Sequence, residues 1–198
     1  MPSMITPIRI VLFGIAVILM AMVAGSILSP PEFSWWRHTA SEQAAQRSPG
    51  AWVMQAGFFA YGLATLAAAL RDRATRPLVR GALALFGVGL VGAAIWSNAP
   101  IVPEQPADVH EDLLHSIASS LVGAAFAAAC AARIFAPGGS RHDFLAWAGL
   151  VISIAIPMAM VAFPDVRGAM QRAMFAFSFI FVTRELRESS RRDTSRQT

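Results

Sequence analysis

The chain has 198 residues, of which 56% are apolar and 14% charged, and its formal net charge is +4. A soluble globular domain has roughly a quarter of its residues charged, so this composition excludes an ordinary soluble domain and indicates an integral membrane protein. The cations are all arginines that lie in short segments between apolar runs. This pattern favours membrane orientation over nucleic-acid binding, and we expect no nucleic-acid partner. The single cysteine, Cys130, excludes an internal disulfide.

Apolar segments recur along the chain at about the length of roughly twenty residues that a helix needs to cross a bilayer. We expect six of them, at residues 7–28, 51–70, 81–97, 112–135, 144–163 and 169–186. The first is longer than the roughly 7–15 apolar residues of a signal peptide, so we interpret it as a retained anchor. The tail at 187–198 is charged and poor in apolar residues, which predicts disorder. The sequence thus predicts an all-α polytopic bundle of six transmembrane helices over residues 1–186.

The arginines predict the orientation of this bundle. Six spans put both termini and the loops at 71–80 and 133–141 on one side of the membrane, together with twelve of the sixteen arginines. The other four, Arg37, Arg47, Arg167 and Arg172, fall on the opposite side. The positive-inside rule then places both termini in the cytoplasm. We expect a multi-pass protein of the cell inner membrane whose partners are membrane lipids.

Acidic, imidazole and hydroxyl groups gather at the start of the fourth expected span. On a helix that turns about 100° per residue, Asp108, Asp112, His115 and Ser119 share one face. Charged groups inside a bilayer cost roughly 2.5 kcal/mol or more, so polar groups in a span usually face the bundle interior or a watery cavity. We therefore predict an extracytoplasmic polar pocket at the outer ends of the second, fourth and sixth spans.

This pocket would bind, and could process, the head group of a lipid or other amphiphile. For catalysis, His115 would act as base or ligand, Asp108 or Asp112 would orient it, and Ser119 would supply a hydroxyl one turn deeper. Arg172 would hold an anionic head group or neutralise one of the aspartates. The candidates for substrate binding are Arg172, Gln55, His38, Glu42 and His110.

Other interpretations of the same residues stay open. A metal site would need His38, Asp108, His110 and His115, but the spacing of five residues between His110 and His115 does not put both on one helix face, and we predict neither metal nor cofactor. The polar groups could also form a hydrogen-bonded network that pins helix ends without turnover. The protein could instead be a non-enzymatic subunit of a larger membrane complex, with docking surfaces at the small residues Gly87, Gly92, Ala124 and Ala128. A transporter is disfavoured by the lack of charge deep in the spans.

Short motifs in the chain resemble those of a bacterial family of six-span membrane proteins known only as a domain of unknown function. They are Ser41-Glu42 in the first outer loop, Asp108 to His110 with His115 following, and Gln171-Arg172 at the start of the last span. The resemblance covers residues 8 to 186. It implies an inner-membrane protein whose polar motifs lie on one side, and it assigns no residue a role.

Overall fold

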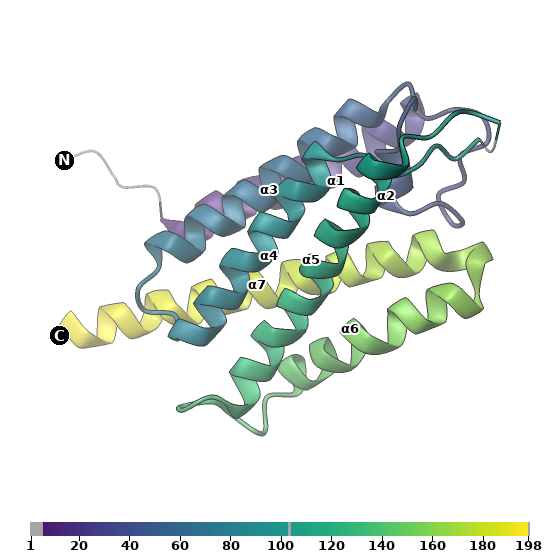
Figure 1. Cartoon of the computed structure of the whole chain (residues 1–198). Helices are drawn as coiled ribbons and strands as arrows, with labels where there is room; N and C mark the ends of the chain where they lie inside the picture. Colours follow the sequence, from purple (N-terminus) through teal and green to yellow (C-terminus); the bar gives the residue numbers. More distant parts are fainter. Residues whose placement is uncertain (1–5, 103, 198) are drawn as a thin grey trace, which may run out of the picture.

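The computed structural model describes residues 6–102 and 104–197, and the side chains of these residues as far as Arg192. Within this part of the chain every regular element is helical, so the predicted all-helical fold is confirmed for it. Six long helices alternate in direction along the bundle (Figure 1). They are α1 (Pro7–Leu28), α3 (Ala51–Arg71), α4 (Pro77–Ile95), α5 (Val109–Phe135), α6 (Phe144–Ala162) and α7 (Arg167–Gln197). A short helix α2 (Ala40–Gln43) and a 3-10 turn η1 (Pro164–Val166) lie in loops.

The two ends of the bundle differ in what they carry. The loops at 29–50 and 96–108 and the turn at 163–166 lie together at one end, which we call the loop end (Figure 1). At the opposite end, which we call the termini end, α1 begins and α7 finishes, and the turns at 72–76 and 136–143 lie there too.

Five helices, α1, α3, α4, α5 and α6, are long and apolar enough to cross a membrane. The protein is therefore a multi-pass membrane protein by the length and composition of its helices. Helix α7 is longer still, but Arg172, Arg184 and Glu185 interrupt its apolar stretch. The described residues thus give five candidate spans, and the sixth stays a prediction.

Capping residues explain where several helices begin. Asp108 accepts hydrogen bonds from the backbone N–H groups of His110 and Glu111 at 2.9 and 3.1 Å, so α5 begins at Val109 and not at 112. Asp143 caps α6 in the same way through the N–H of Ala146. Helix α4 begins at Pro77, because proline has a φ suited to the first helical turn and no N–H to leave unpaired.

Helices α1, α3, α4 and α5 pack successively against one another, and small residues set their spacing. A Cβ atom added to Gly62 of α3 would lie 2.8 Å from the carbonyl oxygen of Gly87 in α4. One added to Gly87 would lie 2.6 Å from the carbonyl oxygen of Gly62. The two backbones therefore touch, as in small-residue contacts between membrane helices, and only glycine fits at either position.

Aromatic rings fill the centre of the bundle. Tyr61 of α3 is fully buried and meets Phe86 of α4 and Phe179 of α7 edge to face, with ring centroids 5.8 and 5.0 Å apart. Phe126 of α5 packs in the same manner against Phe181 of α7 at 5.4 Å. These contacts hold α7 against α3 and α5 around the middle of the molecule.

Helix α6 joins the bundle over its first half only. Its buried residues, Ala146 and Gly149, lie near the termini end, and a Cβ atom on Gly149 would come 2.6 Å from Sγ of Cys130 in α5. Farther along α6, Ile154 and Met158 are exposed. Pro157 interrupts the helix there, where it removes a backbone hydrogen bond. The second half of α6 diverges from α5 and follows α7 (Figure 1).

A cluster of buried charges, the ion cluster, ties α5, α6 and α7 together at the termini end. Nε of Arg133 lies 2.7 Å from Asp143 and 3.3 Å from Glu185, and one of its terminal nitrogens lies 2.6 Å from Glu188. Arg184 binds both carboxylate oxygens of Asp143, at 2.7 and 2.9 Å, and also pairs with Glu188. Burial opposes ionisation of Asp143, but the hydrogen bonds from Arg184, Arg133 and the N–H of Ala146 lower its pKa to about 2.

The sequence predicts a disordered tail at 187–198, whereas α7 continues to Gln197, and Thr198 lies outside the described residues. Leu186 and Ser189 are buried, and the Ser189 hydroxyl donates a hydrogen bond to Asp72 in the α3–α4 turn. Glu188 belongs to the ion cluster. Glu188 and Ser189 thus give the start of this segment ionic and hydrogen-bonded contacts with the bundle. A prediction of order that counts only apolar residues does not detect such contacts.

Candidate functional site

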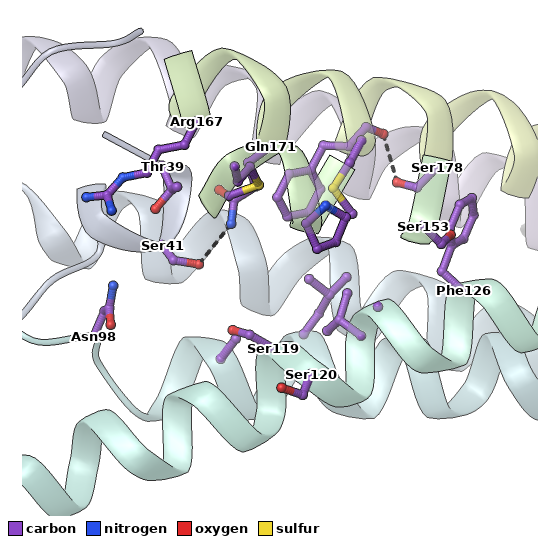
Figure 2. A pocket seen from close by; sticks show the side chains of 18 of the residues that line it. Thr39, Ser41, Asn98, Ser119, Ser120, Phe126, Ser153, Arg167, Gln171 and Ser178 are labelled. Carbon is purple, nitrogen blue, oxygen red and sulfur yellow. Dashed lines mark hydrogen bonds between the residues drawn. The ribbon is translucent and has the colours of Figure 1, made fainter. Parts of the chain in front are cut away.

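A cavity separates α5 from the second half of α6 and from α7. Its volume is about 880 Å³, which lies within the roughly 300–1,000 Å³ typical of ligand sites. Figure 2 shows it with α7 above, α5 below and the loop end to the left. Its wall includes Ser120 and Ala124 of α5 and Pro157 and Val161 of α6, all of them exposed. The cavity therefore opens sideways between α5 and α6, along the length of the bundle.

Polar groups line one end of this cavity and apolar groups line its depth. At the loop end the wall consists of Thr39, Ser41, Glu42, Asn98, Arg167 and Gln171. Deeper in, it consists mainly of Phe58, Phe86, Leu90, Phe126, Met174 and Phe175, with the hydroxyls of Ser119, Ser120, Ser153 and Ser178 between them. The contacts of Phe126 with Phe177 and Phe181 close the apolar end. The cavity is thus amphipathic along its axis.

The polar end is built around the short helix α2. Thr39 and Glu42 form a capping box, in which the Glu42 carboxylate accepts hydrogen bonds from the N–H and hydroxyl of Thr39. Glu42 also forms an ion pair with Arg167, the first residue of α7. The Nε–H of Arg167 donates to the carbonyl of Arg37 at 3.2 Å. Among the described lining residues, the one carboxylate and the one guanidinium are therefore paired with each other.

Gln171 completes this end of the cavity. Its side-chain oxygen accepts a hydrogen bond from the N–H of Ala40 at 2.7 Å, and its amide nitrogen donates to the Ser41 hydroxyl at 3.3 Å (Figure 2). Ser119 and Ser120 extend from α5 toward the same space, and Asn98 lies at its edge (Figure 2). Among the described residues no hydrogen-bond partner is found for the side chains of these last three, which leaves them available to a ligand.

Of the predicted site residues, Ser119 and Glu42 line the cavity, and the others do not. His115 is buried between α5 and the end of α4, where its Nδ1 lies 2.8 Å from the carbonyl oxygen of Trp96. Its other ring nitrogen has no hydrogen-bond partner. The expected contact with Asp108 or Asp112 is not formed, because both carboxylates accept hydrogen bonds from backbone groups.

The acidic groups at the start of α5 hold the loop at 96–108. Asp112 accepts a hydrogen bond from the N–H of Ala99 at 2.7 Å, and Glu111 accepts one from the N–H of Ser97 at 2.9 Å. Gln55 donates to the Ser97 hydroxyl at 2.8 Å. Asp108 caps the helix, and its backbone exchanges hydrogen bonds with Gln46. His110 is exposed beside them. These contacts match the network interpretation, in which polar groups pin helix ends.

Arg172 lies on the other side of the bundle end, inside the loop at 29–50. It is buried, and it donates hydrogen bonds to the backbone carbonyls of Trp35, His38 and Gly168 at 2.8 to 3.0 Å. A further bond reaches the side chain of Gln43, and the guanidinium stacks over the Trp35 ring at 4.3 Å. The predicted pairing of Arg172 with Asp108 or Asp112 is therefore absent, because the terminal nitrogens of this guanidinium bind carbonyl oxygens and its face packs on the Trp35 ring.

His38 also has a local role in this loop. Its Nδ1 accepts a hydrogen bond from the N–H of Ser34 at 2.8 Å. Burial lowers the pKa of His38 below its ordinary value of 6.5, and the positive charges of Arg167, Arg37 and Arg172 act in the same direction, whereas Glu42 acts against them. The imidazole is therefore neutral at neutral pH, as its accepting role requires. The described residues contain no group of three His, Cys, Asp or Glu side chains that could hold a metal.

Two of the expected docking residues are occupied within the chain. Gly87 touches α3, and a Cβ atom on Gly92 would lie 3.0 Å from Cβ of Ala118 in α5. Ala124 lines the cavity, and Ala128 is exposed. Gly87 and Gly92 thus pack this chain's own helices.

Arg167, Gln171, Asn98 and Ser120 are site residues that sequence reasoning missed. A signal was present for two of them, because Arg167, Gln171 and Ser178 recur at helical spacing on one face of an otherwise apolar segment. In the Gln171-Arg172 motif the sequence favours the charged residue, Arg172, as the ligand-binding one. In the structure Gln171 lines the cavity, whereas the side chain of Arg172 points into the loop at 29–50.

Comparison with known proteins gives a family without an assigned activity. No curated protein and no solved structure matches the chain. One family model matches residues 12–183, which is most of the chain and includes every described residue that lines the cavity. The predicted resemblance to a domain of unknown function is confirmed, and the chain belongs to the family described as "Protein of unknown function (DUF998)".

Proposed function

We propose that this protein holds a membrane lipid, or another amphiphile, in the cavity between α5 and α6–α7, with the head group at the loop end and the chain along the apolar wall. The observation that carries the proposal is the sideways opening of a cavity that is polar at one end and apolar at the other. An amphiphile in the surrounding bilayer has this same division, so it would enter without leaving the membrane.

The proposal includes six spans, with α7 as the sixth and both termini in the cytoplasm of a bacterial inner membrane. In support, the arginine that interrupts the first half of α7, Arg172, is buried and hydrogen-bonded, so it would not meet lipid. Exposed Trp36 and Trp52 at the loop end and Trp147 at the termini end lie where aromatic belts meet the two membrane surfaces. The arginine-rich termini end would face the cytoplasm, and the loop end, with the polar end of the cavity, would face outward.

Binding without turnover agrees best with the residues on the wall. Glu42 is the one carboxylate among the described lining residues, and it is already bound by Thr39 and Arg167. No histidine lines the cavity within the described part of the chain. A general base that is free to act on a bound ligand is therefore absent from these residues.

Gly123 provides a direct test. It lines the cavity, and a Cβ atom added there meets nothing within 4 Å, so the side chain of Gly123→Leu should narrow the cavity and obstruct a bound acyl chain without disturbing the helix packing. Gly81→Leu is the matched control, because Gly81 is also on a helix, exposed and unobstructed, but away from the cavity. Protein purified in mild detergent should retain lipid in native mass spectra, Gly123→Leu should lose it, and Gly81→Leu should keep it. Equal lipid retention by all three would refute the proposal.

A further inference from the structure

The charges on the cavity wall cancel. Glu42 and Arg167 are the two charged residues among the described lining residues, and they form an ion pair with each other. The Glu42 side chain is 14% exposed and that of Arg167 is 37% exposed, so both can contact a head group at the polar end of the cavity. A ligand thus meets one fixed positive and one fixed negative charge, and no net charge.

Other charged residues near the polar end of the cavity do not alter this balance of charge. Arg172 is directed into the loop at 29–50, where carbonyl oxygens bind it. Asp112 binds the backbone of Ala99 and does not line the cavity. Arg37 and Asp165 pair with each other at 3.2 Å in solvent, where screening makes their effect small.

The remaining polar groups at the polar end of the cavity are neutral. Within the described part of the chain no partner is found for the amide of Asn98 or the hydroxyls of Ser119 and Ser120, and Gln171 and Ser41 bind each other. The phosphate of an anionic head group can lie beside the partly exposed side chain of Arg167, but it then also lies beside Glu42, and such a head group has no positive charge to offer this carboxylate. A zwitterionic head group can instead direct its phosphate toward Arg167 and its ammonium toward Glu42.

We infer that the site selects amphiphiles whose head group has no net charge, either zwitterionic or uncharged, and discriminates against anionic ones. This inference rests on the proposed function, since it concerns the ligand of the same cavity. The Glu42–Arg167 pair is then the specificity determinant, and its two members act in opposite directions.

The test uses the full chain in nanodiscs that contain equal amounts of phosphatidylethanolamine, phosphatidylglycerol and diacylglycerol with identical acyl chains. Lipid retained after extraction into mild detergent is counted by mass spectrometry. For the wild type we expect retention of the anionic lipid to be about tenfold below that of a net-neutral class, which corresponds to about 1.4 kcal/mol. Retention of phosphatidylethanolamine identifies a zwitterionic ligand, and retention of diacylglycerol an uncharged one; either supports the inference.

Two variants change the charge in opposite senses. Glu42→Gln keeps a residue that suits the capping box, removes the negative charge and should raise the share of phosphatidylglycerol. Arg167→Gln should lower that share further. Glu104→Gln, in the exposed part of the loop at 96–108, removes the same charge away from the cavity and should change nothing.

The outcomes separate the two proposals. The inference about charge would be overturned if the wild type preferred phosphatidylglycerol, or if neither Glu42→Gln nor Arg167→Gln changed the selectivity. In either case, lipid retention that is lost in Gly123→Leu would still support the cavity as a binding site. Retention of every lipid class at the level of Gly123→Leu would instead refute the proposed function itself.

Discussion

Replacing Arg133 by methionine should destabilise the protein far more than removing an arginine from an exposed ion pair. The Arg133 side chain is 7% exposed and lies within 3.3 Å of the carboxylates of Asp143, Glu185 and Glu188. Arg184 would still bind Asp143 and Glu188, but Glu185 would lose its ion pair with Arg133 while its own side chain is only 1% exposed. Removal of one member of a buried ion pair costs about 3–5 kcal/mol, and we expect a loss in this range.

The free energy of unfolding of Arg133→Met is to be measured in mixed detergent micelles by titration with a denaturing detergent. Arg37→Met is the matched control, because Arg37 and its partner Asp165 are 61% and 80% exposed and such pairs contribute less than about 1 kcal/mol. The double variant Arg133→Met/Glu185→Leu should recover much of the loss, since the unpaired buried carboxylate is then gone. A loss in Arg133→Met no larger than that in Arg37→Met would refute this reasoning.

Three further predictions concern other contacts. The pKa of Asp143 is lowered from 3.8 to about 2, so the contribution of its carboxylate to stability is complete above about pH 4 and is lost as the pH falls toward 2. The difference in stability between the wild type and Asp143→Asn, followed by thermal unfolding, should therefore shrink over that range. A Cβ atom on Gly168 would clash with the backbone carbonyls of Trp35 and His38, so Gly168→Ala should lose about 1–3 kcal/mol, whereas Gly81→Ala should not. Arg172→Lys cannot reproduce the several directed hydrogen bonds of the guanidinium, so hydrogen exchange should speed up across residues 33–43; unchanged protection there would contradict this role.

Apolar runs were sufficient to predict the helices, because a segment that is apolar on all sides over about twenty residues has few alternatives to a membrane helix. Helix α7 shows the limit of that reasoning. Several of its polar residues are buried or ion-paired within the bundle, as Arg172 and Glu185 are, so composition alone ends the predicted helix at 186 while the observed one continues to Gln197. Which charges a fold can pair is decided by tertiary contacts, and a sequence read alone does not contain them.

The polar face of α5 was predicted, but its surroundings change along the helix. Near the start of α5 this face meets the end of α4 and the loop that follows, so Asp112 and His115 bind Ala99 and Trp96. One turn deeper the same face borders the cavity, so Ser119 is available to a ligand. Helical spacing identifies residues that share a face, but it does not state which neighbour each of them meets.

The divergence of α6 from α5 connects these features. The ion cluster and the Gly149–Cys130 contact hold the two helices together at the termini end, and Phe126 fills the space beside them. Beyond that point the helices separate, and the cavity wall is apolar for most of its depth. In water such a cleft would close, because burying its apolar surface is favourable. In a bilayer acyl chains are as apolar as the wall, so no such force brings α6 onto α5. The open cleft is therefore the arrangement that the proposed binding of an amphiphile requires, and we expect its persistence to depend on the membrane around it.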